Sequence, residues 1–453
     1  MVTSIAHFSR SGVVLHPQVL SEHFRIFGLL YDTAEAAARE SFKALLQELL
    51  ELYVTHLLGR DKRVPACGID HMSISWRCNR CGSQTRRRFV RNGHYQRALG
   101  THWGHVRGIP VPMLRCQRCG GYVSGSFPFL DKHQRLWDDL WQQALLDCAL
   151  GLSLRQQITR QEAEGLWPVS LQALNCRINR GAQHLLLLRE VQLAEVPPVV
   201  QLDGIYFPIV ERTRQMKRDR RHRLRRRLRS RSRVALVALG LWPDGRHQVL
   251  GWALAASESE ESWRDFLLAL RTRGLTPEAG FRLAIGDGAS ALKQAVDFVY
   301  YGQMPFQLCH FHKIQRIVHR DYLRNRAHRG DLLRDASHVL AGSSLTEVDG
   351  RLQEFCQKWQ EQEPQSVRCF LRNFSRCLTY LQLKGFDALQ FARTTSHAER
   401  LMRELRRRIR QVGTLITDQG AESVLALLIA RLNARWAGQP WLEPLMQAVL
   451  EAA

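Results

Sequence analysis

The spacing of hydrophobic residues separates the first half of the chain into a helical, a loop-rich and a second helical stretch. Over residues 32–58, apolar side chains recur at helical spacing among strong helix formers, which predicts one or two amphipathic helices. From 76 to 122 this period is lost, and Gly, Pro, Cys and basic residues predominate, as in a small module rich in loops. Helical spacing returns at 136–188, and Pro197 and Pro198 end that stretch.

The second half of the chain begins with β-rich sequence and then alternates strands with helices. The pattern predicts two kinds of element, namely strands at 199–207, 233–241, 247–255, 281–287 and 305–311, and helices at 260–273 and 289–301. Three strands with hairpin links, followed by alternating helices and strands, indicate a mixed sheet with helices packed on it. Residues 313–390 have helical sequence, and two more helices follow from Thr395. The chain is therefore expected to be a multidomain α+β protein.

Charge narrows the choice of partner. The 453 residues include 65 Lys and Arg against 42 Asp and Glu, a net charge of +23, while an apolar content of 45% excludes a mostly disordered or fibrous chain. A field of this sign favours a polyanion. Nucleic acid is favoured over a membrane, because the sequence has no lipidation motif, amphipathic anchor or apolar run of about 18 residues. Without a recognisable signal peptide, we expect a cytoplasmic, DNA-associated protein with reduced cysteines.

Nearly half of the excess charge lies in one segment, residues 211–233. It holds 13 Lys or Arg and two acids, a net charge of +11. Because it lies between the first two predicted strands, we interpret it as an extended hairpin tip or as a basic loop that orders on a phosphate backbone. Arg225, Arg226 and Arg227 are its expected DNA contacts. The alternative is a solvated charged loop.

Two CxxC motifs predict a metal site. Cys78 and Cys81 form the first and Cys116 and Cys119 the second, and a glycine follows each of them. Two cysteines at this spacing can both reach one ion at about 2.3 Å, and four thiolates make a closed tetrahedral Zn²⁺ site. Arginines flank the motifs, so we expect a zinc ribbon that contacts nucleic acid. A redox pair or chance core cysteines are the alternatives.

The helical stretch at 136–188 reads as helix, glycine turn, helix, connection and helix. This order is typical of a helix-turn-helix domain, in which the last helix faces the major groove. Arg177 and Arg180 lie on that last helix and are its expected DNA contacts. A helical hairpin that only packs is the alternative.

Three acids in the β-rich half are candidates for catalysis. Asp203 lies inside an apolar strand, where an unpaired charge is costly, and Asp287 ends a later strand. Glu399 lies on a helix, on the same face as Arg403 and Arg406, which we expect to contact DNA. Converging carboxylates suit Mg²⁺ or Mn²⁺, and two such ions can activate a hydroxyl in phosphodiester chemistry. Each acid taken alone is more often a structural residue.

Together these residues resemble the RNase H-like catalytic core of a Mutator-type DDE transposase. Asp203-Gly204 is similar to the first acid of the family, and GDGASAL, which contains Asp287, to the second. The CxxH signature that follows the second acid is matched by Cys309 and His312. TTSHAE with Glu399 is similar to the TTNxxE block of the third acid, although Ser396 stands where the family often has Asn. Trp263 resembles the tryptophan that opens the helix after the third strand.

The resemblance covers about residues 197–437 and implies the function. It implies a transposase that binds element ends and cuts and joins double-stranded DNA, with Mg²⁺ held by Asp203, Asp287 and Glu399. Cys309, His312 and Trp263 would lie near the site, and two element ends imply at least two protomers. The alternatives are an RNase H-like nuclease that cuts without joining, or a domesticated, non-catalytic DNA-binding regulator.

These patterns predict six regions along the chain. A helical region, a zinc ribbon and a helix-turn-helix domain precede the catalytic core, which an all-helical insertion divides in two. The expected boundaries are 1–62, 63–130, 131–196, 197–312, 313–390 and 391–453.

Overall fold

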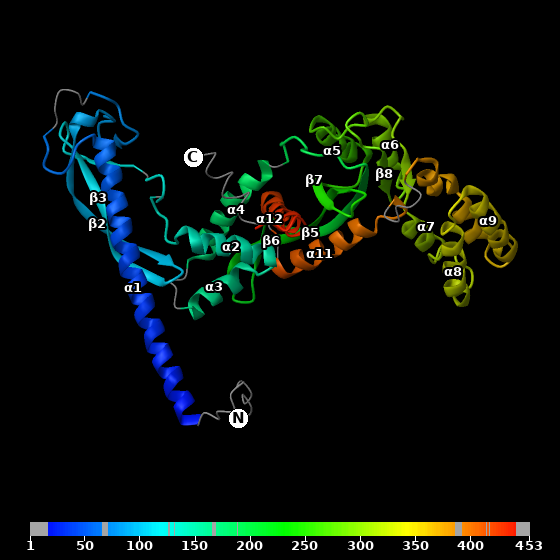
Figure 1. Cartoon of the computed structure of the whole chain (residues 1–453), viewed down its shortest axis with the longest axis horizontal. Coiled ribbons are helices and arrows are strands. Elements are labelled where there is room, and N and C mark those ends of the chain that lie inside the picture. Colours follow the sequence, from blue (N-terminus) through cyan, green and yellow to red (C-terminus); the bar gives the residue numbers. More distant parts are fainter. Residues whose placement is uncertain are drawn as a thin grey trace. The chain divides into compact units, whose positions relative to one another are not determined.

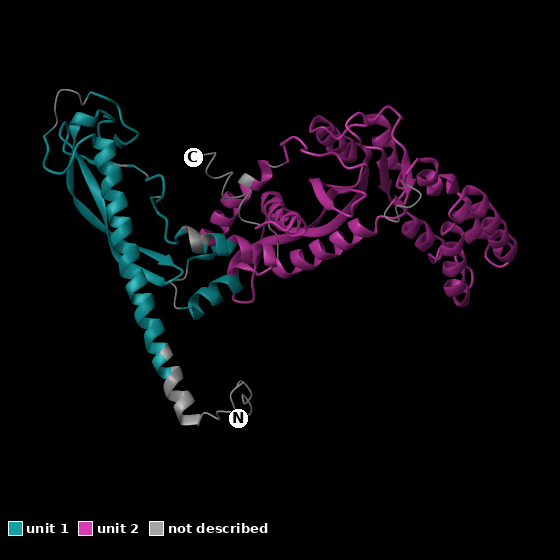
Figure 2. Cartoon of the chain, viewed as in Figure 1, with its two compact units in different colours: residues 1–144, 155–171 teal, residues 145–154, 172–453 magenta. Residues whose placement is uncertain are grey.

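The structure is a computed structural model that describes residues 17–440 except 66–70, 126, 131, 165–168, 188, 386–391, 414 and 416. Both ends of the predicted six-region scheme, 1–16 and 441–453, and its boundary at 390–391 therefore lie outside the described residues. The chain forms two compact units, residues 1–144 with 155–171 and residues 145–154 with 172–453 (Figure 2). Within the described ranges, no helix has both the length and the apolar character needed to cross a membrane.

The first unit is built on one long helix and a small sheet (Figure 1). Helix α1, Pro17–Leu58, is a single helix where the sequence left one or two open. Its residues Leu46, Leu50 and Val54 recur at helical spacing and are buried against the sheet. The sheet has the order β1-β4-β3-β2 and comprises β1 Arg77–Cys78, β2 Phe89–Thr101, β3 Gly104–Cys116 and β4 Tyr122–Ser124.

Three helices follow where the sequence predicts a helix-turn-helix domain. Gly151, with φ +94°, lies between the first two of them, at the predicted glycine turn. They are α2 Asp138–Leu150, α3 Leu154–Ala163 and α4 Leu171–Leu187. Their spacing agrees with the sequence pattern, and the helix-turn-helix assignment stays a prediction.

The second unit contains a five-stranded mixed sheet, as the sequence predicted. Its order is β7-β6-β5-β8-β9, with β5, β6 and β7 antiparallel and β8 and β9 parallel to β5. The strands are β5 Val199–Arg218, β6 Leu224–Leu241, β7 His247–Ala255, β8 Leu283–Gly286 and β9 Phe306–Leu308. The strand predicted at 305–311 is too long, because α7 begins at His310 and buries His310, Lys313 and Ile317 at helical spacing.

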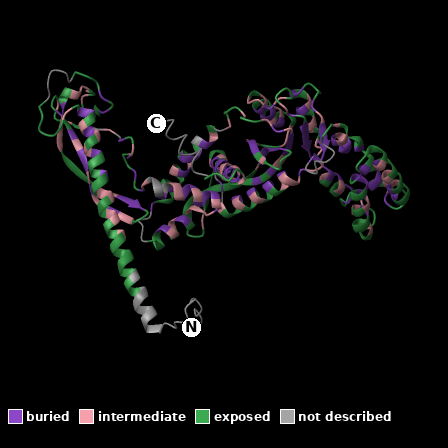
Figure 3. Ribbon diagram, in the orientation of Figure 1, coloured by how far each residue is buried: buried purple, intermediate pink, exposed green. Residues whose placement is uncertain are grey.

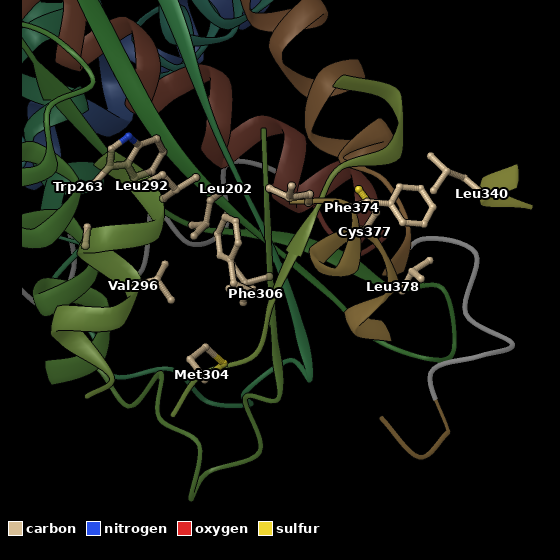
Figure 4. Packing of buried hydrophobic residues seen from close by; sticks show 14 of the residues in the cluster. Leu202, Trp263, Leu292, Val296, Met304, Phe306, Leu340, Phe374, Cys377 and Leu378 are labelled. Atoms are coloured by element: carbon tan, nitrogen blue, oxygen red, sulfur yellow. The ribbon is translucent and has the colours of Figure 1, made fainter. Parts of the chain in front are cut away.

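Helices cover both faces of this sheet. On one face α5 Glu260–Thr272 and α6 Ser290–Val299 pack with Leu202 and Leu236 into the main core (Figure 4). The other face of β5 meets the start of α11. There Gln201 donates from Nε2 to the Thr394 carbonyl at 2.6 Å and accepts from the Ala398 amide at 2.9 Å. Neighbouring residues of a strand point to opposite faces, so Leu202 and Gln201 mark the two sides of β5.

The remaining helices lie C-terminal to β9. Within the described part of 313–390 the chain forms helices, turns and loops, as its helical sequence predicts, and the assignment of this segment as an insertion stays a prediction. These helices are α7 His310–Ile317, α8 Arg329–Leu340, α9 Leu345–Trp359 and α10 Pro364–Leu371, with a 3₁₀ helix at Phe374–Gln382. Two helices close the described chain, α11 Ser396–Val412 and α12 Asp418–Trp436.

The basic segment 211–233 forms a β-ribbon. Of the two structures expected for it, the extended hairpin is therefore correct and the basic loop is wrong. The ladder between β5 and β6 continues outward to the pair Arg218–Leu224, with a register shift between Arg212 and Met216 on β5. Asp219 stabilises the turn, because its Oδ1 accepts from the amides of Arg221 and Arg223. Along β6 the side chains change from buried to exposed at Arg233 (Figure 3). Backbone pairing therefore continues well beyond the part of the ribbon that has a core.

Candidate active site

Asp203 lies on β5, the central strand of the five-stranded sheet. Its Oδ1 accepts a hydrogen bond from the Gly204 amide at 2.9 Å. The pKa of Asp203 is raised to about 6, mainly because burial disfavours the charged form, and the nearby carboxylates of Asp287 and Glu258 act in the same direction. An acid buried beside other acids is poorly stabilised by the protein alone, which is typical of a site that takes a cation.

Asp287 lies beside Asp203 because their strands are parallel neighbours. Gln201 pairs with Ile285, and each acid follows its member of this pair by two residues. Adjacent strands lie about 4.8 Å apart, so the two acids stand at the same level of the sheet. Asp287 is exposed, and its Oδ1 accepts from the Ala289 amide at 2.9 Å. The sequence prediction that this acid is presented at the end of its strand agrees with that position.

Glu399 reaches the same region from α11. It lies in the first turn of the helix, half-buried, and its Oε1 accepts from Thr395 Oγ1 at 3.1 Å. One metal-ligating atom from each of Cys309, His312 and Glu399 lies within 4.8 Å of the others. Asp203 and Asp287 are not part of this tight group, so the three predicted catalytic acids are neighbours whose oxygens do not all converge.

His312 connects the acids electrostatically. Burial alone would lower its pKa, but hydrogen bonding with Cys309 and the negative charges of Cys309, Asp203 and Glu399 raise it to about 9. His312 is thus cationic at neutral pH. Burial raises the pKa of Cys309, yet His312 and Thr395 outweigh it and the net shift is downward. Within the CxxH pair it is therefore His312 that brings a positive charge to the carboxylates, with Cys309 as a further negatively charged neighbour.

Glu258 is a fourth acid in this region, and the sequence pattern does not indicate it. Its pKa is raised, first by burial and next by the charge of Asp287, and its amide donates to the Tyr206 hydroxyl at 3.4 Å. A Cβ atom at position 204 would lie only 2.5 Å from Glu258 Oε1, so the carboxylate rests directly on Gly204. In the sequence, Glu258 stands directly before Ser259, the N-cap residue of α5, and Glu260 and Glu261 follow in the first turn. Acidic residues are common at the start of a helix, so this pattern by itself indicates helix capping and not a site residue.

Comparison with known proteins assigns the family. The family model described as "Transposase, Mutator family" matches residues 29–439. The chain belongs to this family. The resemblance to the Mutator family that the sequence indicated is confirmed, and the protein is a DNA transposase.

Several relatives of this Mutator-family transposase are similar over most of their length. The transposase for insertion sequence element ISRM5 from Rhizobium meliloti is 25% identical over 88% of either chain. The transposase for IS905 from Lactococcus lactis is 23% identical over 76% of this chain and 80% of the relative. Among solved structures, the Drosophila P element transposase strand transfer complex matches with 9% identity and a TM-score of 0.25, covering 69% of this chain and 80% of that one. A score of this size does not establish a shared fold.

The other residues predicted for the transposase site lie in different surroundings. Trp263 is 1% exposed in the main core, packed beside Phe266, and its side chain belongs to the hydrophobic interior rather than to the acidic group (Figure 4). Arg403 and Arg406 are exposed on α11, opposite its buried leucines, as the helical pattern predicted. Five further arginines lie elsewhere, with Arg180 exposed and Arg177 half-buried on α4, and Arg225, Arg226 and Arg227 exposed on the ribbon.

The four cysteines of the CxxC motifs come together in the first unit of the transposase. Their sulfur atoms all lie within 4.8 Å of one another, with Cys78–Cys119 at 3.4 Å and Cys81–Cys116 at 3.8 Å. Tetrahedral ligation with Zn–S bonds of about 2.3 Å requires sulfur separations of about 3.8 Å. The donor type and spacing therefore fit a structural zinc ion.

The backbone of the two cysteine turns explains how they form. The amides of Gly82 and Gly120 donate to the carbonyls of Cys78 and Cys116, and each glycine has φ +68°. This left-handed conformation is the reason for a glycine after each motif. The Cys81 amide is the main cause that lowers the pKa of Cys78 to about 6, which favours a thiolate.

Proposed function

We propose that this transposase cuts DNA at element ends and joins them to target DNA with a DDE site on an RNase H-like core. One observation carries the proposal. Asp203 on the central strand and Asp287 after the parallel neighbour stand at the same level, while Glu399 comes from the helix packed on β5. The sheet order β7-β6-β5-β8-β9, with three antiparallel strands before two parallel ones, supports the RNase H-like assignment.

The ligand set fits Mg²⁺ or Mn²⁺ in charge and in donor type. Asp203, Asp287 and Glu399 offer hard carboxylate oxygens, and the raised pKa of Asp203 is consistent with like charges that gather there. Two divalent ions held there would supply activation of the attacking hydroxyl and stabilisation of the leaving oxygen. Hydrolysis and joining are both nucleophilic attacks on a phosphodiester. One site can therefore use water as the nucleophile first and the liberated 3′-hydroxyl afterwards.

The proposal also assigns roles to two other parts of the chain. Zinc in the four-cysteine cluster would stabilise the fold of the first unit. Helices α2, α3 and α4 would bind the element ends and recognise their sequence. Joining two ends of one element requires at least two protomers on the DNA. The nuclease and regulator alternatives are separated by one assay, because a nuclease cuts pre-labelled element ends without joining them to a target plasmid, and a regulator does neither.

His312→Ala should depress DNA cleavage about tenfold or more without unfolding the protein. Removal of the imidazolium leaves Asp203 and Glu399 without the positive charge that faces them. Cleavage of a labelled end duplex and the melting temperature measure the two effects. His319→Ala is the matched control, since His319 is exposed just beyond α7 and faces Asp321 instead. Wild-type cleavage by the His312 variant would remove this role.

Shortening the ribbon should flatten the salt dependence of DNA binding. The variant replaces residues 213–227 by Asn-Gly, a two-residue turn that suits the pair Arg212–Leu228. Removing one phosphate contact lowers the slope of log K against log salt by about 0.9, whereas selectivity for the element end, which depends on base contacts, should persist. Binding titrations at several salt concentrations, on end and unrelated duplexes, measure both. Equal slopes with and without the ribbon tip contradict the prediction.

A further inference from the structure

We propose that only one side of the β5–β6 ribbon binds DNA, the side that carries Arg225, Arg227 and Arg229. The ligand is the phosphate backbone of a duplex whose cleavage site lies at Asp203. This inference rests on the proposed function. It adds two details, namely the arginines of the basic segment that face the DNA and the distance from the acids over which the duplex is bound.

The first step is the alternation of side chains along β6. Successive residues of a strand point to opposite sides, so every second residue shares a side. From Leu224 to Arg233 this alternation separates two sets. One side carries Arg225, Arg227, Arg229, Arg231 and Arg233, and the other carries Leu224, Arg226, Leu228, Ser230 and Ser232.

The second step assigns each side to a face of the sheet. Asp203 pairs with Val237 and Phe207 with Arg233, so Asp203 and the arginines at odd positions share a side. It is the side of Gln201, which bonds to the start of α11. The other side continues the face of Leu202 and Leu236, which is covered by α5 and α6.

Positive charge is continuous along the side of the sheet that carries Asp203. Helix α11 packs there with Leu401, Leu405 and Ile409 buried, and it exposes Arg403 and Arg406 outward. The ribbon arginines extend the same side beyond the helix. From Val237 to Arg225 the strand covers about 40 Å at about 3.3 Å per residue, which equals about 12 base pairs of B-DNA.

The two sides of the ribbon also differ in the side chains that they expose. The inner arginines are held in place by acids, with Arg233 bonded to Asp418 at 2.9 Å and Arg231 to Glu211 at 3.3 Å. Arg225, near the turn, is bonded to Asp219 at 2.8 Å, whereas Arg227 and Arg229 form no ion pair with the described residues and are exposed. The opposite side carries exposed arginines too, but it intersperses them with three exposed apolar side chains, Leu224, Leu228 and Met216, which gain nothing from phosphate.

The ribbon offers a test with equal charge removed from each side. One variant carries Arg225→Gln, Arg227→Gln and Arg229→Gln. The matched variant carries Arg212→Gln, Arg218→Gln and Arg226→Gln, three exposed arginines whose register places them with Leu224 and Leu228. The proposal therefore removes Arg226 from the DNA contacts expected from the sequence. Both variants change the net charge by the same amount, so long-range attraction falls equally. Binding to a duplex of about 40 base pairs is measured over a range of salt without divalent metal, together with protection of the DNA backbone from hydroxyl radicals.

The first variant should lower the salt slope by about 2 to 3 and shorten the protected DNA by up to about 12 base pairs. The matched variant should change the slope by less than about 1 and leave the protected length unchanged. Equal changes in the two variants, or a larger change in the matched one, overturn the proposal. Asp203→Asn is tested for cleavage in parallel. If that variant still cuts DNA, the catalytic assignment fails while the difference between the two sides of the ribbon stands.

Discussion

Asp203→Asn should abolish metal-dependent DNA cleavage and leave DNA binding unchanged. The expected loss is about a thousandfold or more, the scale for a residue that acts with others as one catalytic unit. Asp287→Asn and Glu399→Gln should do the same, because an amide cannot replace an anionic ligand of a divalent ion. Cleavage of a labelled end duplex in Mg²⁺ and gel-shift binding in its absence measure the two properties.

The same variant should be more stable than the wild type when metal is absent. The pKa of Asp203 is raised from 3.8 to about 6 in the folded state, so ionisation of this group costs the native state stability as pH rises from about 4 to 6. Above pH 6 the full cost is present, and Asn does not incur it. The melting temperature of Asp203→Asn should therefore exceed that of the wild type at pH 8, and the difference should vanish near pH 4.

Asp265→Asn is the control for both measurements. Asp265 lies on α5 with its side chain 69% exposed, so its loss should alter neither cleavage nor the pH dependence of stability. Full cleavage by any of the three acid variants would remove that residue from the proposed site. An unchanged melting temperature for Asp203→Asn at pH 8 would contradict the buried, like-charged environment of this acid.

Cys116→Ser should remove one bound zinc ion per chain and destabilise the first unit. Structural zinc contributes about 10–16 kcal/mol in small zinc-binding peptides. Here α1 and the sheet add a core of their own, so the loss should be smaller. About a third of that contribution would still lower the melting temperature by roughly 10 °C. Metal analysis of the purified protein and thermal unfolding with and without a chelator measure these effects.

Cys176→Ser is the matched control for the zinc prediction. Cys176 is an exposed cysteine on α4, outside the four-cysteine cluster. It should keep the zinc content and the melting temperature of the wild type. Stoichiometric zinc in Cys116→Ser, or a purified wild type that holds none and does not respond to added zinc, would contradict a structural zinc site.

Much of the local structure could be predicted because its signals are short in range. The amphipathic pattern of α11 correctly separates buried Leu401 and Leu405 from exposed Arg403 and Arg406. The CxxC spacing and the glycine after each motif predict two turns with positive φ, which the structure contains. The structure of segment 211–233 was harder to predict, because its many charges are also typical of a loop. The two halves of this segment pair with each other across a turn that Asp219 caps, and this pairing is not visible in the charge pattern.

The sequence by itself determined which residues are the candidates for the chemistry of this transposase: three acids, four paired cysteines and a concentrated run of arginines. Only the tertiary structure decided how they combine. Glu258 joins the acids because Gly204 leaves room for its carboxylate, a contact between segments more than fifty residues apart. The pairing of Asp203 with Val237 likewise decides which arginines of the ribbon share the side of Asp203. Side-chain alternation is a local property, but the face to which it refers depends on strand pairing and on the helices that cover the sheet.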